Sequence, residues 1–181
     1  MLTLGSLRIT APAVMGILNV TPDSFSDGGR YNTFDVALRQ AVAMAEDGAA
    51  IIDIGGESTR PGSAGVSLQE ELDRVMPVIE AVRGATDTPI SIDTSKAAVM
   101  REAVAAGAGM INDVFALRGE GALDAAAELG VPVCLMHMQG EPRTMQAAPR
   151  STDVVEDVAD FLRQRSKACI EAGILRERIL L

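Results

Sequence analysis

Five short apolar runs recur along the chain, and each of them ends in a polar residue. Every run is too short for a helix, and each is followed by a turn and then by apolar residues at helical spacing. This alternation is typical of parallel βα units, in which near-continuous apolar strands are buried on both faces. The pattern predicts strands at residues 14–19, 51–54, 90–93, 109–113 and 133–137.

The polar residues that end these runs predict a binding site. In parallel α/β folds the carboxyl ends of the strands converge on one face, and ligands bind there. One polar residue at a strand end could be a helix cap, but a polar group at every strand end indicates a pocket. These residues are Asn19, Glu57, Asp93, Asn112 with Asp113, and His137. Glu57, like Asp53 in the second run, is expected to be a structural partner of nearby arginine or backbone groups.

The rest of the pattern predicts the helices and the two ends of the domain. Helices are expected over residues 33–47, 67–84 (with a Ser67–Glu70 capping box), 123–129 and 152–172. A further helix, capped by Thr94 and Ser95, is expected to end near Gly107. Residues 2–4 and 7–9 are expected to form a hairpin below the sheet, and residues 179–181 a sixth strand.

Sequential strands without a switch in their connections favour a TIM barrel over a doubly wound sheet. Such barrels usually take about 250 residues and rarely fewer than about 200, whereas this chain has 181. The expected fold is therefore α/β: a (β/α)8 TIM barrel truncated after about six strands, with a short N-terminal β-hairpin. Residues 1–181 are expected to form a single domain that is incomplete at its C-terminus.

Composition narrows the class of function. The net charge of −9 leaves no basic stripe to neutralise nucleic-acid phosphates. The chain shows no signal peptide, and no apolar stretch approaches the length of a membrane span. Cys134 and Cys169 lack metal-ligand spacing, so we expect two reduced thiols in a cytoplasmic protein that binds neither nucleic acid nor membrane.

Five stretches at the predicted strand ends have a more specific pattern. They are residues 15–29, 55–62, 91–96, 111–113 and 135–140, and they include Thr-Pro-Asp-Ser-Phe and Glu-Ser-Thr-Arg-Pro-Gly. Together they resemble dihydropteroate synthase, the folate-pathway transferase that joins a dihydropterin diphosphate to p-aminobenzoate and is the target of sulfonamides. The resemblance runs from Met15 to the last residue, and the family's C-terminal third has no counterpart in this sequence.

The resemblance implies a pterin site at Asp93 and Asn112. A pterin ring presents a flat edge of alternating donors and acceptors, which a buried carboxylate and amide at adjacent strand ends can hold. The alternative is that both residues cap the helices that follow them. Met136 is expected to pack on the flat ring, with ordinary core packing as its alternative. Alternation puts His137, the only histidine, on the opposite face from Met136. A structural role is expected for His137, with direct catalysis as its alternative.

Side-chain alternation along the strands supports this pterin site. Asp93 shares its face with Ser91, and Asn112 shares its face with Met110. These small or polar sets suit the interior of a barrel, whereas the isoleucines between them suit the helix-facing side. We therefore expect Asp93 and Asn112 to face the interior.

The leaving group of the implied reaction is a diphosphate. Its departure leaves a ring-stabilised cation at the exocyclic carbon, so the enzyme chiefly has to stabilise the departing charge with Mg²⁺ and positive groups. Asn19 matches the family's residue for the metal and the diphosphate. One amide oxygen, with several waters and phosphate oxygens, is a common set of ligands for Mg²⁺. The alternative is that Asn19 is a simple turn residue.

Two loops are implied to close over the substrates. In the first, Asp23 is expected to be catalytic and Phe25 to pack on the aromatic amine. In the second, Thr59 is expected to contact the substrate, Arg60 to be catalytic by orienting the loop or the anion, and Pro61 to pack on the amine. Ordinary turn chemistry is the alternative for the Asp and Ser residues of these loops.

Two other functions fit parts of the same pattern. A methyltetrahydrofolate-dependent methyltransferase shares the barrel and the pterin pocket, but the two quoted loop motifs favour the synthase. A non-catalytic protein that binds a pterin or a synthase subunit is the third interpretation. Because the 181 residues lack the family's later Asp, Lys, Arg and His, we expect little or no synthase activity from them alone. The full-length protein is expected to be a homodimer.

Overall fold

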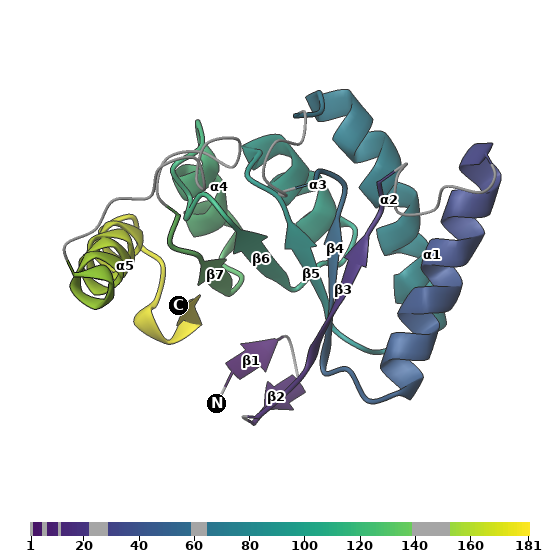
Figure 1. The fold of residues 1–181 in the computed structure, drawn as a ribbon, viewed down its shortest axis with the longest axis horizontal. Helices are drawn as coiled ribbons and strands as arrows, with labels where there is room; N and C mark the ends of the chain where they lie inside the picture. Colours follow the sequence, from purple (N-terminus) through teal and green to yellow (C-terminus); the bar gives the residue numbers. More distant parts are fainter. Residues whose placement is uncertain (1, 5–6, 11, 22–28, 59–64, 139–152) are drawn as a thin grey trace.

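The computed structural model describes residues 2–4, 7–10, 12–21, 29–58, 65–138 and 153–181. In them the chain forms a six-stranded parallel sheet with five α-helices and a separate two-stranded sheet at the N-terminus (Figure 1). The parallel strands are β3 (Met15–Asn19), β4 (Ile51–Gly55), β5 (Ile90–Asp93), β6 (Met110–Asp113), β7 (Val133–Leu135) and β8 (Ile179–Leu180). The helices are α1 (Gly29–Glu46), α2 (Leu68–Ala85), α3 (Ala97–Ala105), α4 (Ala122–Leu129) and α5 (Val154–Glu171), and the short η2 (Arg176–Arg178) precedes β8.

The parallel strands lie in the sheet in the order in which they occur along the chain. Each pairs in parallel with the next, from β3 to β8. A doubly wound sheet would reverse this order at a switch point, whereas a βα barrel winds in one direction. The structure therefore confirms the predicted α/β class with sequential βα units. Among the described residues, β3 and β8 are the two outer strands of the sheet.

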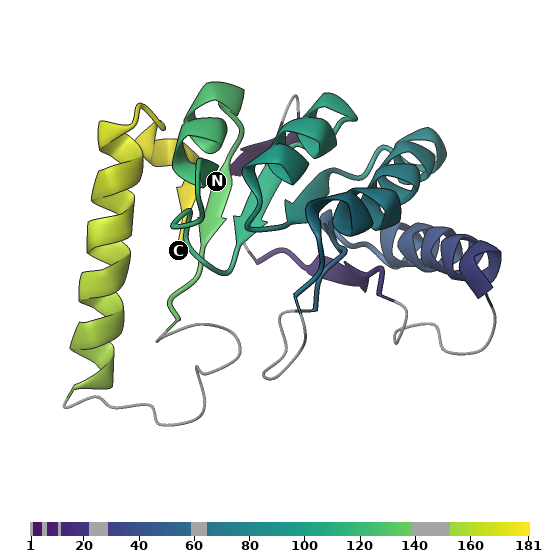
Figure 2. The same ribbon diagram turned by 90° about the horizontal axis from the view of Figure 1, so that it is seen from above.

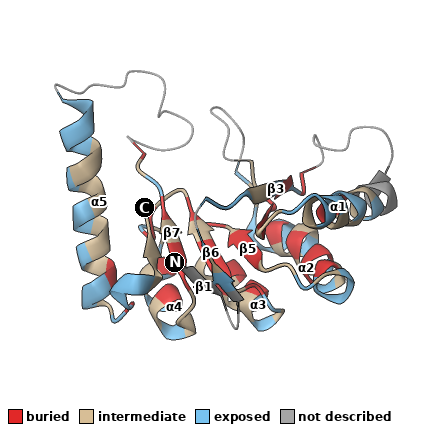
Figure 3. Cartoon of the chain, turned by 90° about the horizontal axis from the view of Figure 1, so that it is seen from below, coloured by how far each residue is buried: buried red, intermediate tan, exposed pale blue. Residues whose placement is uncertain are grey.

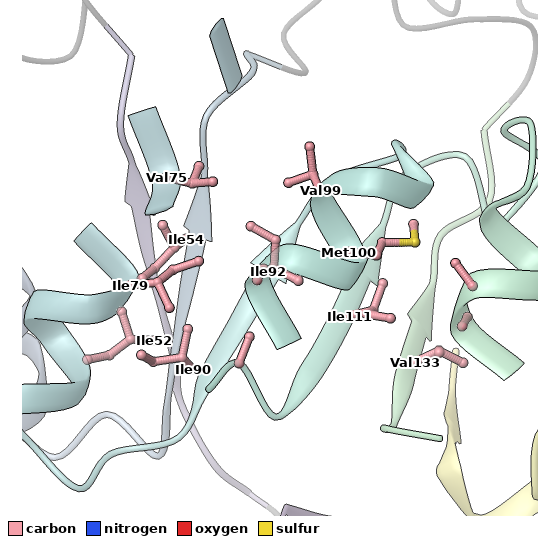
Figure 4. Close-up of a cluster of buried hydrophobic side chains, with 14 of the residues drawn as sticks. Ile52, Ile54, Val75, Ile79, Ile90, Ile92, Val99, Met100, Ile111 and Val133 are labelled. Atoms are coloured by element: carbon pink, nitrogen blue, oxygen red, sulfur yellow. The ribbon is translucent and has the colours of Figure 1, made fainter. Parts of the chain in front are cut away.

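The register of the strands puts their large apolar residues on the face that the helices cover. One row of register partners consists of Leu18, Ile54, Ile92, Ile111, Val133 and Ile179. These residues pack with residues of the helices in one continuous core (Figure 4). Fully burying such a side chain is worth about 1.5–3 kcal/mol, so this row is the main attachment of the helices to the sheet. Figure 3 shows the same burial along the boundary between helices and strands.

The opposite face of the sheet meets the N-terminal hairpin at its lower end. β1 (Leu2–Leu4) pairs antiparallel with β2 (Leu7–Ile9), as the sequence predicts. Ile9 packs against a second small cluster formed by Met15, Ile51 and Met110, which begin β3, β4 and β6. The hairpin therefore covers the amino ends of these strands, on the side away from their carboxyl ends.

Two of the long helices, α2 and α5, begin with side-chain caps. Ser67 Oγ accepts a hydrogen bond from the Glu70 N–H at 3.2 Å, which confirms the predicted capping box of α2 as far as this bond. Asp153 caps α5 in the same way by accepting from the Glu156 N–H at 3.1 Å. No helix in the described part of the chain is long and apolar enough to cross a membrane (Figure 2 shows the helices from above).

Some element ends differ from the sequence prediction. α1 begins at Gly29 and not at residue 33, because the first turn of a helix need not contribute to the core and so lacks apolar periodicity. β7 ends at Leu135 and not at His137, because β6 and β8 offer it no register partners beyond that point. Ser95 does not cap α3, because its hydroxyl donates to Asp113 instead.

Gly56, directly after β4, allows the sheet to approach α2 closely. A Cβ at this position would lie 2.7 Å from Val75 Cγ1 and 3.1 Å from Glu71 Cγ. We expect Gly56→Ala to lower the free energy of unfolding by about 1–3 kcal/mol, because added volume forces packed neighbours apart. Gly84→Ala in α2, with nothing within 4 Å of the new Cβ, is the control. It should be neutral or stabilise by up to about 1 kcal/mol. Urea unfolding measures both, and equal effects would contradict the close approach.

Candidate functional site

A row of register partners crosses the sheet at the carboxyl ends of its strands. It consists of Asn19, Gly55, Asp93, Asn112 and Cys134, one residue from each of β3 to β7. The row lies on the face away from the helices, because each member is one residue from the helix-facing row. Asp93 and Asn112 are direct partners and half-buried, whereas Asn19 is exposed. The structure thus confirms the predicted interior face of Asp93 and Asn112.

A second layer lies one pleat closer to the amino ends of the strands. Asp53 and Ser91 are register partners on β4 and β5, and they are 2% and 0% exposed. The Asn112 side chain reaches this layer, where its Nδ2 donates to Asp53 Oδ2 at 2.9 Å. Within the described residues, Asp53 Oδ1 and Ser91 Oγ have no hydrogen-bond partner. Since buried polar atoms are normally paired, this layer has hydrogen-bonding capacity left over for another group.

The carboxyl group of Asp93 lies in an acidic environment. Burial, followed by the charges of Asp53, Asp113, Glu71 and Glu57, raises the pKa of Asp93 to about 7. Both effects disfavour the charged form. At neutral pH the group is divided between acid and carboxylate, so it can donate or accept a hydrogen bond from this position.

Burial also raises the pKa of the neighbouring groups. It raises the pKa of Asp53, and the side chains of Ser91 and Asn112 offset part of that rise. The Ser91 hydroxyl lowers the pKa of Asp53 as a nearby polar group, although it forms no hydrogen bond within the described residues. Burial, then the charges of Asp53 and Asp93, raises the pKa of the Cys134 thiol. Cys134 therefore stays protonated and is a poor nucleophile.

Lys96, which follows the end of β5, is engaged by two carboxylates. Its Nζ donates to Glu57 after β4 and to Glu71 of α2. Burial alone would lower the pKa of Lys96, but the two carboxylates outweigh burial and raise it. Glu71 is fully buried, and its Oε1 has no partner among the described residues. The ammonium group is therefore committed to holding this cluster together.

Asn112 and Asp113 are adjacent in sequence but lie on opposite faces of β6. Asp113 is fully buried and accepts from two backbone N–H groups of the following loop, both at 2.8 Å. In this loop Ala116 and Leu117 have positive φ angles of 53° and 58°, a conformation that is strained for residues with a Cβ. Arg165 of α5 donates to both of their carbonyls at 2.8 and 3.2 Å. The end of β6 is thus fixed from the helix side.

Met136 and His137 follow directly after β7. The Met136 side chain is 40% exposed, so it is not part of the core, and its contact with a ligand ring stays a prediction. The His137 ring packs edge-to-face against Phe161 of α5, with 5.1 Å between ring centroids. This contact with a covering helix agrees with the structural role expected for His137.

The predicted loop residues lie outside the described part of the chain; they are Asp23, Phe25, Thr59, Arg60 and Pro61. The described root of the second loop is held by α2 and by the start of α3. Arg74 Nη1 donates to the Gly56 carbonyl at 2.8 Å, and Lys96 donates to Glu57. These two bonds therefore fix the position of Gly56 and Glu57, which precede the second loop.

Comparison with known proteins agrees with this geometry. Residues 15–181 match the family model described as pterin binding enzyme. The chain belongs to the pterin-binding enzyme family. It is 56% identical over 174 residues to a protein of Haemophilus influenzae named dihydropteroate synthase. The matched region covers 96% of this chain and 63% of that protein. The chain spans about three fifths of the length of the curated relatives it matches.

Solved structures of similar proteins share the fold. The Yersinia pestis dihydropteroate synthase with a sulfonamide drug complex has a TM-score of 0.92 and 54% identity, covering 98% of this chain and 66% of that one. The Xanthomonas albilineans dihydropteroate synthase with 4-aminobenzoic acid has a TM-score of 0.86 and 56% identity, covering 93% of this chain and 59% of that one. These matches confirm the resemblance that the strand-end motifs indicate.

Two features of the site differ from what the sequence indicates. The sequence predicts an arginine or backbone partner for Asp53, whereas Asp53 accepts from the Asn112 amide. Alternation relative to Gly55 would have placed Asp53 on the interior face. Glu57 pairs with Lys96 and not with an arginine, and the buried Glu71 joins them. No sequence spacing reveals this cluster, because it depends on how α2 and α3 pack.

Asp93 should make the stability of the chain depend on pH. Its pKa rises from 3.8 to about 7 in the folded state. The folded state therefore favours the neutral carboxyl group; the chain is most stable below pH 3.8, and this part of its stability is lost as the pH rises through 7. Asp93→Asn removes this loss. Relative to the original chain, we expect the variant to gain roughly 2 kcal/mol of unfolding free energy between pH 4 and pH 8. Urea unfolding at pH 4, 6 and 8 measures this gain, and parallel curves for the two proteins would contradict the assignment.

Proposed function

We propose that this chain provides the pterin-binding part of a dihydropteroate synthase. The reaction condenses 6-hydroxymethyl-7,8-dihydropterin diphosphate with p-aminobenzoate to give 7,8-dihydropteroate and diphosphate. The observation behind this proposal is that Asp93 and Asn112 are register partners on the interior face of the sheet, in a chain that belongs to the pterin-binding family. The relatives named dihydropteroate synthase support the choice of reaction.

Pterin recognition is assigned to Asp93, Asn112 and Met136. A carboxyl group and an amide at adjacent strand ends offer donors and acceptors side by side, which suits the edge of a pterin ring. Both groups are half-buried, so a bound ring that left either of them without a hydrogen-bond partner would bind less tightly. The site therefore favours ligands that match both its shape and its hydrogen bonds. Met136 would pack its flexible thioether on the face of the ring.

Asn19 is assigned to the diphosphate end of the substrate. Its exposed amide at the end of β3 offers one neutral oxygen. This donor set fits Mg²⁺, which commonly takes few protein ligands and keeps waters and phosphate oxygens. When bound, Mg²⁺ supplies positive charge that stabilises the departing diphosphate. Asn19 would orient the leaving group on the exposed side of the row.

The two loops complete the proposed mechanism. Loss of diphosphate leaves the positive charge delocalised over the pterin ring, and the amine of p-aminobenzoate attacks the exocyclic carbon and releases a proton. Asp23 is proposed to be catalytic, Arg60 to orient the loop or the anion, Thr59 to contact the substrate, and Phe25 and Pro61 to pack on the amine. The homodimer and the cytoplasmic location also stay predictions.

Pterin binding tests the proposal directly. We expect Asn112→Ala and Asp93→Asn each to weaken 6-hydroxymethylpterin binding by about 5- to 150-fold, equivalent to about 1–3 kcal/mol per lost partner. Asp124→Asn, on the exposed side of α4, is the control and should leave the affinity unchanged. Calorimetric titration measures all three. Unchanged affinity in both site variants would remove these residues from the pocket, and no binding by the original chain would reject the proposal.

Turnover separates the synthase from its alternatives. The assay is diphosphate release from the dihydropterin diphosphate with p-aminobenzoate and Mg²⁺. We expect the 181 residues alone to be at least about 10²-fold slower than a full-length relative, because they lack the family's later Asp, Lys, Arg and His, and Lys96 is already bonded to Glu57 and Glu71. Turnover equal to the relative's would contradict this account of the charge. Methyl transfer from methyltetrahydrofolate without diphosphate release would favour the methyltransferase.

A further inference from the structure

The hydrogen bond from Asn112 to Asp53 joins strands that are not neighbours. β5 lies between β4 and β6, so the bond spans two strand spacings, about 10 Å of backbone separation. The two side chains nevertheless meet at 2.9 Å. On β5, which lies between them, the residue level with Asp53 is the small Ser91, and the residue level with Asn112 is Asp93. Gly55, the next residue of β4 on this face, has no side chain. A Cβ on Gly55 would already lie 3.4 Å from Asp93 Oδ2.

This bond fixes the orientation of the Asn112 amide. An ionised carboxylate only accepts hydrogen bonds, so it selects the Nδ2 side of the amide. The carbonyl Oδ1 lies on the other side of the planar group and is directed away from Asp53. Asp53 is 2% exposed, and among the described residues its hydrogen-bond donor is Asn112. Turning the amide over would therefore leave the buried carboxylate facing an oxygen, which is strongly unfavourable.

We propose that Asp53 is a positioning residue that sets the specificity of the site by holding the Asn112 carbonyl toward the ligand. This inference rests on the proposed pterin site. The site then accepts a ligand that presents an N–H donor to Asn112 and rejects one that presents an oxygen acceptor there. Ser91 serves as the small spacer that lets Asn112 and Asp53 meet across β5. Neither Asp53 nor Ser91 needs to contact the ligand for this effect.

A pair of ligands tests the proposal. 6-Hydroxymethylpterin and 6-hydroxymethyllumazine have the same bicyclic ring and substituent, but donors and acceptors are exchanged along the N1–C2 edge. We expect the original chain to bind the pterin at least about tenfold more tightly, because one buried unpaired group costs about a factor of ten. In Asp53→Asn the amide at position 112 can adopt either orientation, so the preference should fall by about tenfold.

Two controls separate positioning from general damage to the fold. Ser91→Ala keeps the spacer small and should keep the preference within about twofold of the original, since it leaves the Asn112–Asp53 bond intact. In an Asn112→Ala background, Asp53→Asn should have no further effect on the preference, because the group it orients is gone. An equal loss of preference in Ser91→Ala and Asp53→Asn would overturn the proposal, as would an effect of Asp53→Asn that persists without Asn112.

A measurement on the original chain keeps the proposal testable if Asp53→Asn does not fold. One of the two side-chain amide protons of Asn112, assigned by their loss in Asn112→Ala, should be protected from solvent exchange in the ligand-free chain, because it is bonded to Asp53. Rapid exchange of both protons would overturn the proposal. If the original chain binds neither ligand, the pterin site itself fails. If it binds both ligands equally, the site stands and the positioning role of Asp53 fails.

Discussion

The alternation of side chains along in-register parallel strands is the constraint on which the rest of this structure depends. Because register partners share a face, one row of aliphatic residues attaches the helices, and the rows beside it are available for polar groups. Ile92 and Ile111 lie in the first row, and their sequence neighbours Asp93 and Asn112 lie in the second. A shift of one residue would exchange the two faces. Fold and site are therefore fixed by the same register.

Placing carboxylates on the interior face has an electrostatic cost. Asp53 and Asp93 are partly or fully removed from water, and burial raises the pKa of both. Lys96, three residues after Asp93 in the sequence, is engaged by Glu57 and Glu71. Such unfavourable charge is typical of functional sites, where groups are kept ready for a ligand at the expense of stability. Asp93 illustrates this, because the substitution that should stabilise the chain should also weaken its proposed ligand.

Asn112 and Asp113 are adjacent in sequence but have different roles. Asp113 holds the structure together, and Asn112 belongs to the proposed binding site. Asp113 and Arg165 hold a loop with two positive φ angles from the helix side, which fixes the end of β6. Asn112 is then presented to the interior, and Asp53 orients its amide. Positioning groups of this kind determine how precisely a site recognises its ligand, because a ligand-contacting side chain is selective only when its own orientation is fixed.

Much of the fold could be predicted from the sequence, because strand periodicity and strand-end polarity are local signals. They place Asp93 and Asn112 correctly on the interior face. The two short apolar runs around Gly5 and Ser6 likewise predict the hairpin, whose Ile9 packs beneath the strands. The Lys96 cluster could not be predicted, because it depends on contacts between residues far apart in sequence. The early start of α1 was missed because its first turn lacks the apolar pattern. The roles of Asp23, Thr59 and Arg60 rest on the resemblance, since these residues lie outside the described structure.

The most direct test of the central claim is to map where a pterin contacts the chain. Titration of 6-hydroxymethylpterin into ¹⁵N-labelled protein, followed by NMR, reports this residue by residue. The account predicts the largest changes at the backbone amides of Asp93 and Asn112 and at the Asn112 side chain, with little change on the outer surfaces of α4 and α5. Changes confined to the helix-covered side, or none at a ligand concentration that saturates the relatives, would contradict it.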